Sequence, residues 1–175
     1  MLDNKDMKIF SAIIVTVIIC VSTVLIVGHL SSQEYGNELS ALYDYKINRV
    51  WEVLTTIEKY PENKKDLLHL EILDGSYGKI FEWREIYSDK VMEYKIIEDS
   101  PYYYVLEVSE NDFYKGTFEY YLEFDSKTKL TIKETSFNEN IWERGLDVIF
   151  RREQRINREF KWIRVSLLSN LIYEI

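Results

Sequence analysis

Two patterns of apolar residues constrain the fold of this chain more than any other feature. Between residues 68 and 137, apolar side chains recur at every second position in several short segments, which is the spacing of half-buried β-strands. From Trp142 to Leu171 they recur at steps of three, four and seven, which is the spacing of one face of a long helix. An antiparallel sheet curled around that helix would bury both patterns, so we expect an α+β domain.

The alternation divides the expected sheet into about seven strands. Turn-forming Gly, Asp, Ser and Pro residues separate strands expected at residues 39–46, 68–72, 79–87, 91–98, 102–109, 115–125 and 129–137. Two short helices are expected after the first strand. Asn48 can cap a helix over 49–56, and Pro61 suits the first turn of a second helix over 61–67.

The first thirty residues predict a membrane anchor. No charged side chain occurs from Ile9 to Gly28, and a helix of about twenty residues spans the hydrocarbon layer of roughly 30 Å. The chain is therefore divided into a tail over 1–8, a transmembrane helix over 9–30, a tether over 31–37 and a domain over 38–175. The alternative is a cleaved signal peptide, but the apolar run exceeds the usual length of about 7 to 15 residues and no small-x-small cleavage site follows it.

The charges beside this span predict its orientation. Lys5 and Lys8 precede it, whereas residues 31–45 contain three acidic side chains and, up to Tyr45, no Lys or Arg. Because Lys and Arg favour the cytoplasmic side of a membrane, we expect a cytoplasmic N-terminus and a domain on the extracytoplasmic side of the cell membrane.

Charge and composition exclude several classes of function. The net charge is −8, whereas proteins that bind nucleic acid are usually basic, so no nucleic-acid partner is expected. Cys20 is the only cysteine, and the two histidines, His29 and His69, have no acidic cluster beside them. We therefore expect no disulfide, no metal site and no cofactor. The sequence also lacks a Gly-rich phosphate loop and a Ser-His-Asp pattern, which argues against nucleotide-dependent enzymes and hydrolases.

Three segments carry a resemblance to a known family. Residues 50–61, VWEVLTTIEKYP, resemble the VWxVLTDxxxYP pattern in the opening helices of the SRPBCC superfamily, whose members are also called START-like or polyketide cyclase/dehydrase-like. Residues 116–122, GTFEYYL, and residues 130–134, LTIKE, are similar to the GxWxYxL and LTIxE strands of that superfamily. The resemblance covers residues 38–171, which is nearly the whole chain after the expected anchor.

The chain departs from the family pattern in two places. Ile47 and Asn48 stand where a proline usually opens the first helix, and Asn63 and Lys64 stand where a tryptophan often follows the YP pair. The resemblance implies a helix-grip fold, in which the sheet wraps the long C-terminal helix and leaves a cavity between them. Across the superfamily, such cavities hold lipids, sterols, quinones and polyketides.

The expected anchor and the resemblance together imply a membrane-anchored module that binds a hydrophobic small molecule or lipid between sheet and helix. The anchor would keep the cavity near the bilayer, where such molecules are stored. Two alternatives remain open at this point. One is an enzyme of the cyclase or dehydrase type, with acid–base chemistry in the same cavity. The other is a structural, partner-binding protein whose cavity is filled by its own aromatic side chains.

The candidate cavity residues alternate along the strands. Aromatic side chains share one face within each strand, and Glu134 is in phase with Leu130 and Ile132, where an unpaired carboxylate would be costly. The alternative is that the aromatic side chains fill an ordinary core. The candidates for ligand binding are Phe81, Trp83, Tyr94, Tyr102, Tyr104, Phe118, Tyr120 and Glu134.

A cluster of basic residues occupies the last helix, opposite its apolar stripe. From this cluster, Arg151, Arg155 and Arg158 are candidates for a surface that contacts anionic lipid headgroups or a partner. The alternative is a solvated helix face whose charges pair with acidic residues on the strands, where each exposed ion pair contributes little to stability.

Overall fold

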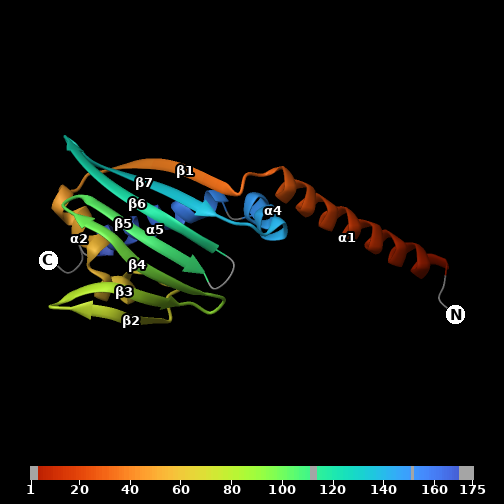
Figure 1. Ribbon diagram of the computed structural model, residues 1–175, viewed down its shortest axis with the longest axis horizontal. Coiled ribbons are helices and arrows are strands. Elements are labelled where there is room, and N and C mark those ends of the chain that lie inside the picture. Colours follow the sequence, from red (N-terminus) through yellow and green to blue (C-terminus); the bar gives the residue numbers. More distant parts are fainter. Residues whose placement is uncertain (1–3, 111–113, 151, 170–175) are drawn as a thin grey trace. The chain divides into compact units, whose positions relative to one another are not determined.

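A computed structural model describes residues 4–110, 114–150 and 152–169 of the chain (Figure 1). The chain divides into two compact units. One unit consists of residues 1–33 and 138–152, and the other consists of residues 34–137 and 153–175. The second unit contains the antiparallel sheet, and the first contains a pair of helices.

The sheet of the second unit is antiparallel and has seven strands. They are β1 (Glu34–Tyr43), β2 (His69–Ser76), β3 (Lys79–Ile86), β4 (Val91–Ser100), β5 (Tyr103–Glu110), β6 (Tyr114–Asp125) and β7 (Lys127–Phe137). Their spatial order is β1-β7-β6-β5-β4-β3-β2. Strands β2 to β7 therefore pair with their neighbours in sequence, whereas β1 crosses to the far edge and pairs with β7.

Helices cover one face of this sheet. Three short ones, α2 (Ile47–Thr55), η1 (Ile57–Lys59) and α3 (Tyr60–Asn63), follow β1, and the longer α5 (Arg152–Ser169) follows the sheet (Figure 1). Because apolar residues recur along α5 at steps of seven and four, Ile156, Ile163 and Leu167 share one face and are fully buried. They join the inward residues of the strands in a single hydrophobic core.

This arrangement confirms the helix-grip fold expected from the sequence, and the differences are at the ends of elements. β1 begins at Glu34, five residues before the expected start at Leu39, because its backbone pairs with β7 from the pair Glu34–Phe137 onwards. Backbone pairing does not require side-chain alternation, which is why the pattern missed these residues.

Two further differences concern a turn and a helix. The turn between β2 and β3 is reduced to Tyr77 and Gly78, whose φ values are 52° and 77°, as a two-residue type I′ hairpin requires. The helix expected over residues 142–171 is described as α4 (Ile141–Phe150) and α5, and Arg151 between them lies outside the described residues.

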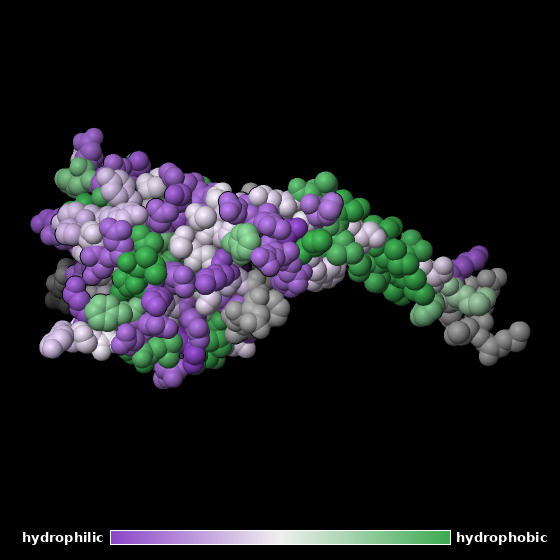
Figure 2. Space-filling model, in the orientation of Figure 1, coloured by the Kyte–Doolittle hydropathy of each residue, from purple (hydrophilic) through white to green (hydrophobic). Residues whose placement is uncertain are grey.

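The first unit pairs α1 (Asn4–Leu30) with α4. Residues Met7–Leu30 of α1 contain an 18-residue window whose mean hydropathy is 2.9 and of which 6% is buried, so the helix is long and apolar enough to cross a membrane. Apolar residues cover α1 along most of its length in Figure 2. A signal sequence near the N-terminus can meet the same criteria of length and apolar composition.

The two helices of the first unit approach each other closely at two glycines. A Cβ atom added to Gly28 of α1 would overlap the backbone carbonyl of Ile141, and one added to Gly145 of α4 would overlap the carbonyl of Val24. Arg144 fixes the contact, because its Nε donates a hydrogen bond of 3.0 Å to the carbonyl oxygen of Gly28. The last two turns of α1 are therefore tied to the first turns of α4.

Candidate functional site

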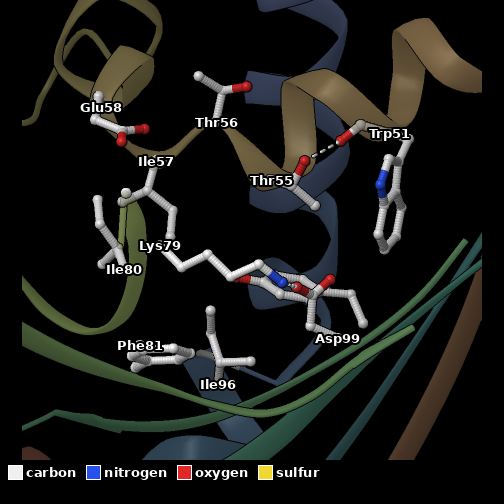
Figure 3. A pocket seen from close by; sticks show the side chains of 12 residues that line it. Trp51, Thr55, Thr56, Ile57, Glu58, Lys79, Ile80, Phe81, Ile96 and Asp99 are labelled. Carbon is white, nitrogen blue, oxygen red and sulfur yellow. Dashed lines mark hydrogen bonds and ion pairs between the residues drawn. The ribbon is translucent and has the colours of Figure 1, made fainter. Parts of the chain in front are cut away.

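The second unit contains a pocket of about 370 Å³ between α2, η1 and strands β3 to β5 (Figure 3). The residues that line it are Trp51, Thr55, Thr56, Ile57, Glu58, Gly78, Lys79, Ile80, Phe81, Ile96, Asp99 and Tyr104. The C-terminal end of α2 forms one side, and side chains from the strands form the opposite side. A ligand here would therefore lie between helix and sheet.

The pocket combines an apolar wall with a charged rim. Ile80, Phe81 and Ile96 of β3 and β4 supply apolar side chains to it (Figure 3). At the rim, the Nζ of Lys79 lies 3.4 Å from Oδ2 of Asp99, and their side chains are 68% and 38% exposed. Ion pairs this exposed contribute little to stability, so both groups can turn toward a ligand at little cost.

Tyr104 contributes a buried polar group to this pocket. The residue is only 2% exposed, and its hydroxyl has no hydrogen-bond partner among the residues that the structure describes. Burial, and then the nearby charge of Asp99, raise the pKa of Tyr104, so the hydroxyl remains protonated and can donate. A buried donor without a partner is costly, and a ligand with an acceptor group could satisfy it.

A second polar cluster, which we call the lysine cage, lies in the core of the same unit. The Nζ of Lys64 lies 4.3 Å from the ring centre of Tyr60, 4.8 Å from that of Trp162 and 5.4 Å from that of Tyr94. The same atom donates a hydrogen bond of 2.7 Å to Oε1 of Glu85. The aromatic rings and the carboxylate thus hold a lysine that is 8% exposed.

Glu85 is fully buried and accepts hydrogen bonds beyond that of Lys64. Nε1 of Trp83 donates to Oε1 of Glu85 at 3.2 Å, and the hydroxyl of Tyr87 donates to its Oε2. Burial raises the pKa of Tyr87, as does the charge of Glu85. Because both carboxylate oxygens have donors, the lysine cage is a satisfied structural cluster.

A third cluster surrounds Glu134 on β7. Glu134 is fully buried, and its Oε1 accepts hydrogen bonds from Nε of Arg155 and, at 3.0 Å, from the hydroxyl of Tyr114. The guanidinium of Arg155 also lies 4.5 Å from the centre of the Tyr114 ring. These contacts join β7, β6 and α5 through one charge pair.

Comparison with solved structures shows which fold this is. The crystal structure of Ara h 8.0201 matches with a TM-score of 0.62 and 19% identity, over 78% of this chain and 99% of that chain. The aromatase/cyclase ZhuI from Streptomyces sp. R1128 matches with a TM-score of 0.65 and 12% identity, over 79% and 96%. The second unit therefore has the helix-grip fold of these structures. Ginseng major latex-like protein 151 from Panax ginseng matches this helix-grip domain with a TM-score of 0.62 and 10% identity, over 79% and 98%.

Sequence comparison adds nothing to this assignment. No family model matches the chain, and no curated protein matches it. The similarity of the helix-grip domain to known proteins is therefore one of fold, and its chemistry has to be argued from its own residues.

The helix-grip domain brings only some of the candidate cavity residues to the pocket. Phe81 and Tyr104 line it. Tyr102 lies beside the pocket residue Trp51, at 5.9 Å between ring centres, and its hydroxyl donates a 2.6 Å hydrogen bond to Asn48. Pocket binding by these residues remains a prediction.

The other candidates lie in the core of the domain. Trp83 and Tyr94 stack with 5.0 Å between ring centres, and Phe118 packs against Tyr120, whose hydroxyl donates a 3.1 Å hydrogen bond to Glu159. All four aromatic residues are 7% exposed or less, so the interior between sheet and α5 is largely filled near them.

The three arginine candidates have different surroundings. The side chain of Arg155 is 13% exposed and contacts Glu134 and Tyr114. Arg158 is exposed and donates a 3.3 Å hydrogen bond to Gln154 on the same helix. Arg151 lies outside the described residues. A lipid-facing role for this cluster remains a prediction, and Arg155 is already engaged in a buried pair.

Several residues of these clusters are not among those that the sequence pattern predicts. Glu85 is in phase with Phe81 and Trp83 on β3, so the same alternation that selected those two residues also pointed to it. Lys64 was noticed only as a departure from the family pattern. Among residues 4–110, 114–150 and 152–169, no three His, Cys, Asp or Glu side chains gather closely enough to bind a metal ion.

The buried tyrosines predict a loss of stability at high pH. Burial raises the pKa of Tyr60, Tyr94 and Tyr120 well above the ordinary value, and that of Tyr43 to about 12. Below pH of about 10 both folded and unfolded chains keep these protons. At higher pH only the unfolded chain releases them, so the free energy of unfolding should fall as the pH rises toward 12.

The measurement is an alkaline titration that records phenolate absorbance and circular dichroism on the same sample. The absorbance change from the buried tyrosines should coincide with loss of the sheet signal. Complete ionisation of every tyrosine while the sheet signal persists would contradict this prediction.

Proposed function

We propose that the helix-grip domain binds a small molecule that has an apolar body and a hydrogen-bond acceptor, and that α1 holds the domain at a membrane. The observation that carries the first part is Tyr104, which lines a pocket with an apolar wall and whose buried hydroxyl has no hydrogen-bond partner among the described residues. The acceptor of the ligand would bond this hydroxyl, and its body would pack on Ile96 and Phe81.

The size of the pocket supports a compact ligand. A volume of about 370 Å³ lies near the lower end of the range of about 300 to 1,000 Å³ for small-molecule sites. The lysine cage and the stacked core aromatics occupy much of the space between sheet and α5. The similarity to an aromatase/cyclase agrees with a ring-containing molecule of moderate size, such as a quinone or a polyketide fragment.

The second part rests on α1. Residues Met7–Leu30 would form a helix of about 36 Å, which exceeds the hydrocarbon layer of roughly 30 Å. Lys5 and Lys8 at its start favour a cytoplasmic N-terminus and an extracytoplasmic domain. A hydrophobic ligand would then reach the pocket from the adjacent bilayer.

Native mass spectrometry of the full chain, released from detergent micelles, tests the ligand-binding proposal. The wild-type chain is expected to carry a bound mass after incubation with lipid and quinone extracts. Thr55→Trp should lose it, because the larger side chain at the end of α2 fills the pocket (Figure 3). Tyr104→Phe should weaken binding by roughly 2- to 15-fold, since one hydrogen bond contributes about 0.5–1.5 kcal/mol.

Thr135→Trp is the matched control, because Thr135 is exposed on β7 and does not line the pocket. It should bind like the wild type. Tyr104→Phe should also keep wild-type thermal stability, since it removes a hydroxyl that has no protein partner among the described residues. A wild-type chain that remains bare in all extracts would refute the binding proposal and favour a domain whose filled core serves partner binding.

A further inference from the structure

One face of α4 is apolar and exposed. Trp142 and Ile149 are seven residues apart and therefore lie on the same side of the helix, with Leu146 between them. Trp142 is 37% exposed, Ile149 is 40% exposed and Phe150, at the end of the helix, is 59% exposed. Large apolar side chains gathered on one helix face usually mark a contact surface.

Contacts between α4 and α1 fix the position of this face along the axis of α1. Arg144 donates to the carbonyl of Gly28, and Gly145 packs against the backbone of Val24, so α4 lies beside the last two turns of α1 (Figure 1). Counted from Met7, these turns begin about 26 Å along the helix, at the depth where a roughly 30 Å hydrocarbon layer ends. α4 would therefore meet the boundary between lipid chains and headgroups.

The first backbone N–H groups of α4 and the side chain of Arg144 are hydrogen-bonded within the unit. The side chain of Asn140 caps α4 by accepting hydrogen bonds from the backbone N–H groups of Trp142, at 2.9 Å, and Glu143, at 3.3 Å. Besides its bond to Gly28, Arg144 donates to the carbonyl oxygens of Asn138 and Glu139. The guanidinium of Arg144 and the first N–H groups of α4 are therefore hydrogen-bonded by protein atoms. This lowers the free-energy cost of placing this end of the helix next to lipid.

From these observations we propose that the exposed face of α4 inserts into the lipid–water boundary beside the C-terminal end of α1. Tryptophan is enriched at this boundary, and Ile149 and Phe150 would reach the adjoining acyl chains. The occupant is lipid because α4 packs against α1, a helix with an exposed apolar surface, on which Ile26 is 58% exposed and Leu30 is 79% exposed. This inference rests on the proposed anchoring by α1.

The test uses the full chain in liposomes of phosphatidylcholine and phosphatidylglycerol, with a fluorophore on a single cysteine. In a Cys20→Ser background, Phe150→Cys places the label at the end of α4. Phe124→Cys on β6 is the matched control, since Phe124 and Phe150 are both 59% exposed. Labelled wild-type chain, with Cys20 as its only cysteine, reports separately whether α1 is in the bilayer.

Brominated lipids are expected to quench most of the fluorescence of the label at position 150 and at Cys20. The fluorescence of the label at position 124 should remain unchanged. Quenching at Cys20 with none at position 150 would overturn the inference and leave the anchor intact. Equal quenching at positions 124 and 150 would also overturn it, because it would indicate general adsorption. A blue-shifted but unquenched label at position 150 would show that protein covers α4. An unquenched Cys20 would refute the anchor and this inference together.

Discussion

Lys64→Met is expected to destabilise the helix-grip domain by about 3–5 kcal/mol, a large part of the roughly 5–15 kcal/mol that keeps a domain folded. The substitution retains most of the apolar length of the side chain but removes the ammonium that donates to Glu85 at 2.7 Å. A fully buried carboxylate would then lose its opposite charge while remaining out of water. Thermal and urea unfolding of the variant measure the effect.

Two variants distinguish this explanation from a general loss of packing. Lys59→Met removes a lysine whose side chain is 47% exposed and pairs with Glu52 at 3.3 Å, and it should change stability by less than about 1 kcal/mol. Lys64→Met combined with Glu85→Gln should recover most of the lost stability, because no buried charge remains. A single Lys64→Met variant as stable as the wild type would refute the buried-charge argument.

Gly28→Ala combined with Gly145→Ala is expected to separate α4 from α1. Each added methyl group would overlap a backbone carbonyl of the opposite helix, and backbone cannot rotate away as a side chain can. Such overpacking typically costs about 1–3 kcal/mol per site, more than the roughly 0.5–1 kcal/mol that alanine gains over glycine in a helix. The hydrogen bond from Arg144 to Gly28 should be lost as well.

Hydrogen–deuterium exchange of the full chain measures this separation. Peptides covering residues 141–150 should exchange much faster in the double variant, while those of the sheet remain unchanged. Gly36→Ala is the matched control, since the nearest heavy atom to its added Cβ is 3.9 Å away. Unchanged exchange of α4 in the double variant would show that the close contact of the two helices is not required.

Much of the fold could be predicted because burial of one face imposes a period on the sequence. Alternation located the strands, and helical spacing located the buried face of α5 through Ile156, Ile163 and Leu167. The ends of helices and strands could not be predicted where backbone geometry, and not side-chain burial, sets them. β1 starts early because pairing with β7 needs no apolar side chain, and the β2–β3 turn is short because Tyr77 adopts a positive φ.

The site could be predicted only in part, because the volume left between packed elements does not follow from alternation. Phe81 and Trp83 are two residues apart on β3, yet Phe81 lines the pocket and Trp83 is sealed in the core. Glu134 was identified as buried from its phase with apolar neighbours. Lys64 was not, because only the contact of α3 with the strands and α5 brings its ammonium to Glu85.

The position of β1 has a consequence for synthesis of the chain. β1 leaves the ribosome with the helix before it, but among the described strands it pairs only with β7. Its residue Ser40 contacts Thr131, which is synthesised 91 residues later. At roughly 5–20 residues per second, β1 would wait about 5–18 s with both edges unpaired. During that interval β1 could pair with a strand of another nascent chain. Correct folding of this protein should therefore depend on chaperones, or on wide spacing between the ribosomes on one messenger RNA.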